Sequence, residues 1–249
     1  MLSAMITPRI RCLPALLVAA ALAAGGTGAT LGAQTRAHPV TGRQYAPTMS
    51  VEGAPWLERR ERDREEEPDL ALRLLKVPKG AMVGDVGAGS GYMSLRLARL
   101  VGAEGRVYAV DVQPGMLQLL QQNAAKAKLA NVVPVLGTID DPKLPAGALD
   151  LIIMVDVYHE FSEPQKMLQR MREALKPGGR LALWEYRAED PNVPILPLHK
   201  MSQPQVVKEL EANGFKLVGQ FDRLPWQHVL QFSRNDSALP KVDLRAWRP

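Results

Sequence analysis

The sequence VGDVGAGSG, residues 83–91, decides the fold class because an apolar strand runs directly into a glycine-rich turn. Glycine at Gly87, Gly89 and Gly91 lets the backbone turn sharply and lie against a ligand with no Cβ atom in between. A helix that begins after Gly91 would add unpaired N–H groups and the positive end of its dipole. The order is GxGxG behind Asp85, whereas a dinucleotide-binding fingerprint has its third glycine one place later. Alone, this turn is compatible with nucleotide binding or with a purely structural role.

Outward from this turn, short apolar runs alternate with helical stretches, a pattern typical of a parallel α/β sheet. The runs predict strands buried on both faces at residues 82–86, 107–110, 132–136, 151–155 and 181–184. Helices are expected at residues 92–100, 116–129 and 163–175. Residues 216–221 and 229–232 predict a closing hairpin, one strand of which runs antiparallel to the rest. The sequence therefore predicts a Rossmann-like, doubly wound α/β fold.

Two later helix starts carry capping signals. Ser162 is followed three residues later by Gln165, and Ser202 by Gln205, which is the spacing of a capping box. Each has a proline in the first turn, where a missing N–H costs nothing. We therefore expect helices to begin after these serines, and Gly214 to end the last helix.

The first residues have the order of a secretory signal. Arg9 and Arg11 precede an apolar run at residues 13–24, and small residues at 31–33 offer a cleavage site before Gln34. The apolar run is much shorter than the ~20 residues that a transmembrane helix needs. We expect the protein to be exported, to the periplasm or the exterior. If the signal stays uncleaved, it would instead anchor the protein in the membrane.

Removal of residues 1–33 would leave no cysteine, because the one cysteine of the chain is Cys12. The remaining chain would then lack disulfides, cysteine metal sites and cysteine nucleophiles. Its charges are interspersed, and the dense mixture at residues 58–67 predicts a solvated helix face rather than a nucleic-acid surface. No metal site is predicted from the histidines, which show no paired helical spacing: His38, His159, His199 and His228.

A second polar signal is Asp111, which follows the apolar run 107–110 about 20 residues beyond the glycine turn. A carboxylate at this place can hold both hydroxyl groups of a ribose. The alternative is that Asp111 caps a helix ahead of Pro114. A third marker is LKPGGR at residues 175–180, which alone indicates only a tight turn before the fifth strand.

In this order, the motifs resemble class I S-adenosylmethionine-dependent methyltransferases. The matching pieces are VGDVGAGSG at 83–91, VYAVD at 107–111, DLIIMVDVYHE at 150–160 and LKPGGRLAL at 175–183. The resemblance implies S-adenosylmethionine as cofactor and a mostly parallel seven-stranded sheet with an antiparallel C-terminal hairpin. By pattern the chain is similar to the branch that contains quinone-ring and arsenite methyltransferases. The arsenite enzymes rely on cysteines that the chain would lack after residue 33, so arsenite methylation is not expected.

This resemblance divides the chain into four parts. Residues 1–33 are expected to be the signal, residues 34–69 an N-terminal extension with a helix, residues 70–233 the S-adenosylmethionine-binding domain, and residues 234–249 a tail.

The resemblance also implies cofactor contacts, residue by residue. The methionine part would be lined by Asp85, Gly87, Ala88, Gly89 and Gly91. Asp111 would hold the ribose and Val112 would pack on the adenine. Many relatives place an aspartate against the adenine amine where this sequence has Thr138. We expect Asp140 to take that contact instead, with Ile139 on the ring.

The chemistry needs few groups, because a sulfonium methyl is already activated and the protein mainly aligns the reacting atoms. An acidic acceptor such as a phenol would be helped by a base near the carboxyl end of the fourth strand. The catalytic candidates there are Asp156, Tyr158 and His159. His159 has the ordinary pKa that suits a base near neutrality, although it could instead only shape the pocket.

Further candidates follow the fifth strand, namely Glu185, Tyr186, His199 and Lys200. The loop at 187–200 is long enough to form one wall of a pocket. His199 and Lys200 could meet an anionic acceptor there, or they could simply be an exposed pair.

These implications favour methyl transfer from S-adenosylmethionine to a small-molecule acceptor. Two alternatives stay open. The export signal is compatible with a methyltransferase that acts on a protein or envelope component. It is also compatible with a binding module without catalysis, because the methyl donor is made inside cells. The sequence leaves the oligomeric state open.

Overall fold

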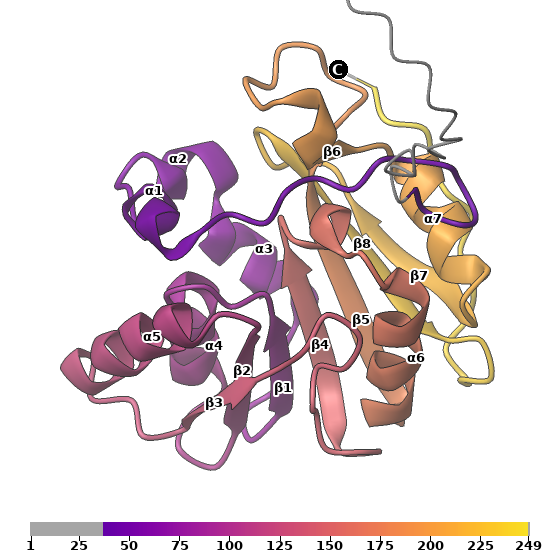
Figure 1. Cartoon of the computed structure of the whole chain (residues 1–249). Coiled ribbons are helices and arrows are strands. Elements are labelled where there is room, and N and C mark those ends of the chain that lie inside the picture. The colour runs from indigo at the N-terminus through magenta and orange to yellow at the C-terminus, as the bar shows by residue number, and fades with distance from the viewer. Residues whose placement is uncertain (1–36, 249) are drawn as a thin grey trace, which may run out of the picture. The chain divides into compact units, whose positions relative to one another are not determined.

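One sheet runs through the computed structural model, which describes residues 37–248 (Figure 1). Its strands are β1 (Met82–Val86), β2 (Arg106–Asp111), β3 (Val132–Leu136), β4 (Leu149–Val155), β5 (Leu175–Arg187), β6 (Lys200–Met201), β7 (Phe215–Phe221) and β8 (Gln227–Arg234). Seven of them follow the order β3-β2-β1-β4-β5-β8-β7, and the two-residue β6 pairs with β5 outside this path. β8 runs antiparallel to β5 and β7, whereas β1 to β5 pair in parallel. The predicted Rossmann-like fold is confirmed, and the predicted signal at residues 1–33 lies outside the described residues.

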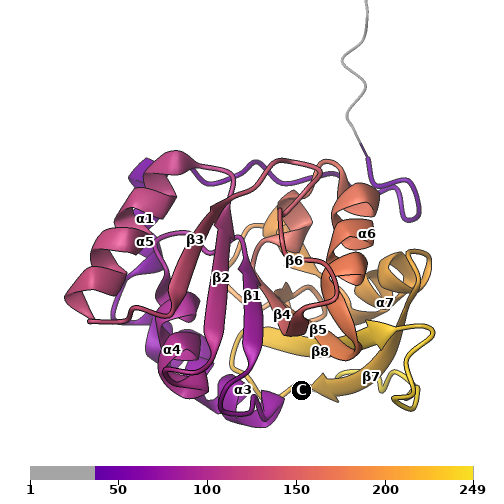
Figure 2. The same cartoon turned by 90° about the horizontal axis from the view of Figure 1, so that it is seen from below.

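Helices cover both faces of this sheet (Figure 2). They are α1 (Ala54–Leu57), α2 (Arg62–Glu66), α3 (Pro68–Leu75), α4 (Tyr92–Val101), α5 (Pro114–Lys126), α6 (Pro164–Ala174) and α7 (Gln203–Glu211). Three short 3₁₀ turns are η1 (Val51–Gly53), η2 (Tyr158–Glu160) and η3 (Pro197–His199). The three helices expected between the strands are present as α4, α5 and α6. None of the helices described over residues 37–248 is long and apolar enough to cross a lipid bilayer.

The core follows the alternation of side chains along the central strands. On β4, Ile152 and Met154 pack with α6 and α7, whereas Leu151 and Ile153 face α3 and α4. Because successive side chains of a strand point to opposite faces, a strand between two helical layers must be apolar throughout. This requirement explains why β4 appears in the sequence as an unbroken apolar run.

Strand β3 departs from the prediction that every apolar run is buried on both faces. It lies at the edge of the sheet, its residues are only partly buried, and Leu136 is 53% exposed. An edge strand has a neighbouring strand on one side only. Its side chains are therefore less buried than an apolar run of this kind predicts.

The two capping predictions have different outcomes. Ser202 is the N-cap of α7, and its Oγ accepts a hydrogen bond from the Gln205 N–H at 3.4 Å. The prediction for Ser162 is wrong, because α6 begins at Pro164 with Glu163 in the N-cap position. Gly214, with φ +81°, follows the end of α7 closely, as expected for a helix stop.

The chain on either side of the sheet is also fixed to it. The N-terminal segment, residues 37–53, crosses the end of the sheet in mostly extended form, as Figure 1 shows in indigo. The Ala46 N–H donates to the carbonyl oxygen of His159 at 3.1 Å, which ties this segment to η2. In the C-terminal tail, the Val242 N–H donates to Leu217 on β7 at 2.9 Å.

His228 on β8 is a buried imidazole, and neither ring nitrogen has a hydrogen-bond partner among the described residues. Burial, together with the charge of Arg187, lowers the pKa of His228 from 6.5 to about 3. Between pH 3 and pH 6.5, the His228 imidazole is protonated in the unfolded chain and neutral in the folded protein. The free energy of unfolding therefore falls as the pH drops below 6.5, and the slope from this group approaches about 1.4 kcal/mol per pH unit near pH 5.

Replacing His228 should remove this contribution. We expect His228→Leu to gain about 1 kcal/mol relative to the parent protein when the pH is lowered from 6.5 to 5.5, because half of the unfolded imidazoles already bind a proton at pH 6.5. Urea unfolding of both proteins at the two pH values measures the difference, and other titrating groups cancel because they are common to both. A stability difference that does not change with pH would contradict the assignment.

Candidate active site

A cavity of about 380 Å³ opens at the carboxyl ends of β1, β2 and β4. This is the edge at which open α/β sheets bind ligands, and the volume lies within the range of small-molecule sites. The loop after β5 supplies one wall through residues 194–196, as expected for the loop 187–200. The N-terminal segment and its short helices supply another through Thr48, Met49, Trp56, Leu57 and Arg62.

The glycine turn forms the floor between β1 and β2. The N–H groups of Gly87 and Ala88 both donate to the carbonyl oxygen of Val110 at 2.9 Å, so the turn is fastened to β2. Gly87 has φ +80°, and a Cβ atom there would overlap with Val157. The cavity is lined by Asp85, Gly87, Ala88 and Gly89, four of the residues for which a cofactor contact is predicted.

Gly91 is the exception among the predicted glycines, because it does not line the cavity. It is the N-cap of α4 with φ +96°, and a Cβ atom there would lie 2.7 Å from Leu95 Cδ1. The role of Gly91 is therefore to turn the chain into α4 against a packed neighbour. The cofactor contact of Gly91 stays a prediction, and the structure gives this glycine a conformational role.

Asp85 is buried at the end of β1, and its Oδ2 accepts a hydrogen bond from Ser94 Oγ at 2.5 Å. Burial raises the pKa of Asp85 to about 6, against the opposing effects of the Ser94 hydrogen bond and the Arg62 charge. At neutral pH this carboxylate is therefore mostly ionised, and it gives the cavity a negative group beside the glycine turn.

Asp111 ends β2 and holds the glycine turn. Its Oδ2 accepts from the Gly89 N–H and its Oδ1 from the Gln113 N–H, each at 2.9 Å. Burial raises the pKa of Asp111, against these backbone hydrogen bonds. The N-cap of α5 is Gln113, so the alternative that Asp111 caps this helix is not realised.

The predicted adenine contacts divide into two groups. Val112 and Ile139 line the cavity and are exposed apolar side chains, 41% and 58% respectively, as a ring-packing role requires. Thr138 lines the cavity as well, whereas Asp140 does not. The Asp140 carboxylate instead accepts a hydrogen bond from Thr138 Oγ1 at 2.7 Å. The structure therefore does not bring the Asp140 carboxylate to the cavity wall, and its contact with the adenine stays a prediction.

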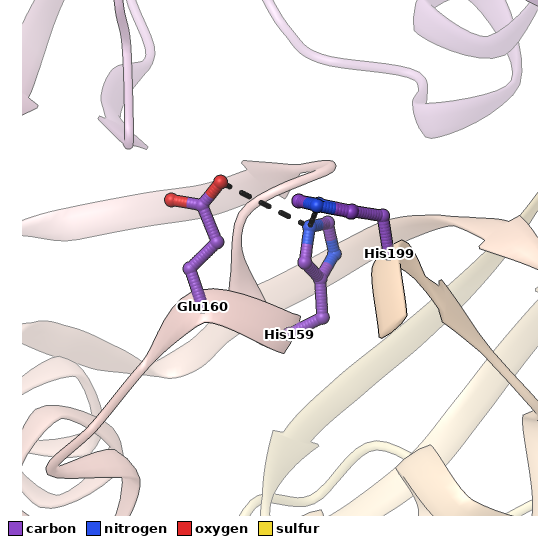
Figure 3. Close-up of side chains that lie close together, drawn as sticks. All are labelled: His159, Glu160 and His199. Atoms are coloured by element: carbon purple, nitrogen blue, oxygen red, sulfur yellow. Dashed lines mark hydrogen bonds and ion pairs between the residues drawn. The ribbon is translucent and has the colours of Figure 1, made fainter. Parts of the chain in front are cut away.

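His159 lies on η2, directly after β4, and lines the cavity while remaining 2% exposed. Its Nδ1 is 2.6 Å from Oε2 of Glu185, a buried residue of β5. Its Nε2 is 3.0 Å from His199 Nδ1, as Figure 3 shows. The other Glu185 oxygen accepts the Tyr158 N–H at 2.9 Å. Because an ionised carboxylate only accepts, Nδ1 of His159 carries a proton and the Nε2 lone pair points toward His199 and the cavity.

Tyr158 is not positioned for the predicted catalytic role. It is fully buried, does not line the cavity, and its hydroxyl lies 3.3 Å from His38 Nε2. Its ring packs edge-on against Phe161, at 5.6 Å between centroids. Neighbouring side chains on a 3₁₀ turn point in different directions, so His159 faces the cavity while Tyr158 enters the core.

Asp156 lines the cavity but belongs to a buried network of charges. Its Oδ2 accepts from Gln227 Nε2 at 2.7 Å and lies 3.8 Å from Nη2 of Arg62. Arg62 Nε in turn donates to Glu66 at 2.8 Å, and the Tyr186 hydroxyl donates to the same carboxylate at 3.0 Å. Burial, with the nearby Glu66 charge, raises the pKa of Asp156 well above its usual range.

The prediction of a solvated helix face at residues 58–67 is wrong at Arg62 and Glu66, because both side chains are buried.

His199 and Lys200 are not an exposed pair. His199 lines the cavity and meets His159, whereas Lys200 Nζ donates to the carbonyl of Val193 at 2.5 Å and fastens the loop. Sequence reasoning missed this pairing of histidines and the buried Arg62. The first had a signal, because both histidines follow the carboxyl ends of neighbouring strands.

Comparisons with known proteins agree with this geometry. The methyltransferase domain family matches residues 78–232, which is more than half of the chain. A solved structure of a SAM-dependent methyltransferase from Aquifex aeolicus is 26% identical, with a TM-score of 0.71, over 74% of this chain and 98% of that one. The fold, the glycine turn and this match define the class of protein.

The chain belongs to the methyltransferase domain family. Among curated relatives, a demethylmenaquinone methyltransferase of Listeria monocytogenes serotype 4a is 29% identical over 49% of this chain and 51% of its own length. An uncharacterised methyltransferase of Mycobacterium bovis is 33% identical over 52% of this chain and 50% of its own. The chain thus spans about half the length of these curated relatives.

The glycine turn generates a direct test. We expect Gly87→Ala to lower the free energy of unfolding by about 2 to 4 kcal/mol, because a positive φ and the overlap with Val157 both oppose a Cβ atom. Gly178→Ala is the matched control, since a Cβ there meets no atom within 4 Å. Denaturant unfolding of both variants measures the loss. Equal stability of the two variants would refute this account of Gly87.

Proposed function

We propose that the protein transfers a methyl group from S-adenosylmethionine to a small-molecule acceptor. One observation carries the proposal: a single cavity joins the glycine turn and Asp111 to His159. The first two groups suit the cofactor, and the histidine suits the acceptor. Membership of the methyltransferase domain family and the likeness to the Aquifex protein support the same conclusion.

The residues present fit this cofactor. Asp85 offers an ionised carboxylate for the methionine ammonium, and Arg62 offers a buried cation for the methionine carboxylate. Each oxygen of Asp111 accepts one backbone N–H and keeps a lone pair for a ribose hydroxyl. Val112 and Ile139 present apolar surface for the adenine.

The mechanism assigns the protein two tasks. S-adenosylmethionine supplies an electrophilic methyl group on its sulfonium sulfur. Asp85 and Asp111 fix where the donor lies, which sets the line along which an acceptor must approach. His159 presents its Nε2 lone pair to the acceptor side of the cavity, where it can accept a proton from an acidic acceptor such as a phenol. Glu185, buried behind the ring, stabilises the imidazolium that results.

The cavity suits an acceptor with an apolar body. Beside its polar groups it is lined by Trp56, Leu57, Phe161, Met167, Ile195 and Leu196. The Listeria relative is named for a demethylmenaquinone substrate. Hydroxylated ring compounds of the quinol kind are therefore the first acceptors to test.

Export is part of the proposal and rests on the sequence of residues 1–33, with its arginines, apolar run and small residues. It makes an envelope component or protein an alternative acceptor. If export and cleavage occur, the protein recovered from the periplasm or medium should begin at Gln34, which N-terminal sequencing tests. A chain recovered only from the cytoplasm, with its first residues intact, would reject this part.

Calorimetric titration with S-adenosylhomocysteine tests the cofactor assignment. We expect the parent protein to bind it and Asp111→Ala to bind about 10- to 100-fold more weakly, because the ribose hydroxyls lose a charged acceptor. Asp243→Ala is the matched control and should bind like the parent, since this exposed carboxylate does not line the cavity.

Absence of binding by folded parent protein would reject the proposed function. Binding without turnover would leave a non-catalytic module. Transfer of a labelled methyl group into an envelope extract then separates the acceptor classes, because a labelled protein band would contradict the small-molecule acceptor.

A further inference from the structure

Three side chains with metal-binding atoms converge at the acceptor end of the cavity, and Figure 3 shows them turned toward one another. His159 Nε2 lies 3.0 Å from His199 Nδ1 and 4.0 Å from Glu160 Oε1. The ligand atoms of all three residues lie within 4.8 Å of one another. We propose that His159, Glu160 and His199 bind one divalent cation of the zinc type. The inference rests on the proposed function and deepens it, because the cation would hold the acceptor.

The donor set identifies the kind of cation. Two imidazole nitrogens and one carboxylate are ligands that zinc prefers over magnesium or calcium. Catalytic zinc sites have three protein ligands, two histidines and a glutamate among the known sets, and keep a fourth position for water or substrate. Zinc bonds of about 2.0–2.1 Å place tetrahedral ligand atoms about 3.3 Å apart. The observed separations of 3.0 and 4.0 Å lie on either side of this value, so a small rotation of the Glu160 side chain completes the site.

Hydrogen bonds from neighbouring groups orient His159 and Glu160, as is usual for metal ligands. The His159 Nδ1–H donates to Glu185 at 2.6 Å, which fixes the tautomer with its lone pair on Nε2. Glu185 is fully buried and is itself fixed by the Tyr158 N–H. The Glu160 carboxylate receives hydrogen bonds from Thr48 and from the Met49 backbone, so it too has outer partners.

Cation binding would replace the hydrogen bond between the imidazole rings of His159 and His199. Without a cation, the His199 Nδ1–H donates to the lone pair of His159 Nε2. A cation takes the place of that proton, which moves to the other ring nitrogen of His199. A lone pair that binds a cation cannot accept a proton, so His159 then acts as a ligand instead of as a base.

The fourth coordination position faces the cavity, because all three ligands line it. A hydroxyl oxygen of the acceptor bound there would lose its proton to solvent more readily, as zinc-bound water does. That oxygen would then form its bond to the methyl carbon as the bond from the methyl carbon to sulfur breaks. The acceptor class is therefore a molecule with an ionisable hydroxyl group.

The test uses untagged full-length protein in which Cys12→Ser removes the one thiol. The protein is stripped with a chelator, then titrated with Zn²⁺ by calorimetry and with Co²⁺ by visible absorption. We expect one cation per chain and the Co²⁺ bands of a four-coordinate site. Azide should shift these bands, because the fourth position is open.

Variants of the proposed ligands test whether the calorimetric and absorption changes come from a cation bound at these residues. Glu160→Gln and His199→Ala should each weaken cation binding by more than the about 10- to 100-fold that loss of an outer partner causes. Glu163→Gln makes the same chemical change at the N-cap of α6, outside the cavity lining, and should bind like the parent. Thermal unfolding of each variant confirms that it is folded.

Three results would overturn the inference. They are the absence of one bound cation per chain, equal cation affinity of Glu160→Gln and the parent protein, and Co²⁺ absorption bands that azide does not shift. Titration of the same samples with S-adenosylhomocysteine keeps the two proposals apart. Binding of S-adenosylhomocysteine without a cation would reject only the cation site, and a bound cation without S-adenosylhomocysteine binding would reject the proposed function.

Discussion

The register of the parallel strands is the constraint on which the site depends. Val86 of β1 is paired with Val110 of β2 and with Met154 of β4, so these strands end at the same edge of the sheet. Val155 is paired with Trp184, which brings the end of β4 beside β5. Loops that are far apart in the chain are therefore brought to one place by backbone hydrogen bonds alone. A slip of one residue would exchange the faces of every side chain on the strand and dismantle the site.

Buried polar pairs make this edge rigid. Glu185 and His159 form one hydrogen-bonded pair, and Arg62 and Glu66 form an ion pair, with all four side chains nearly inaccessible. A buried charge or polar group without a partner is destabilising, so each of these groups is held by the presence of the other. These pairs matter because they fix the positions of polar atoms, not because they add to the free energy of unfolding. The cavity thus has walls whose polar atoms are fixed before any ligand arrives.

The N-terminal segment completes the site although it lies outside the region that carries the family motifs. Its residues line the cavity, and Arg43 connects it to the rest of the fold through Glu209 at 3.1 Å and the His159 carbonyl at 2.9 Å. The segment therefore supports η2, and through η2 it supports the orientation of His159. In the structure, the extension and the domain that matches the family thus form walls of the same cavity.

The sequence by itself determined seven of the eight strands described, the glycine turn and the placement of Asp85 and Asp111, but it missed β6 and predicted a turn at 175–180 where β5 already begins. These features depend on residues that are neighbours in the chain, so apolar periodicity and local turn chemistry are sufficient to find them. The tertiary structure alone decided that His159 meets His199, 40 residues away, that Tyr158 enters the core, and that the charges of α2 are buried. Periodicity reports which face of an element is apolar, but it does not report which distant charge will neutralise another. That choice is made when the strand ends are aligned and the loops between them must share the same small volume.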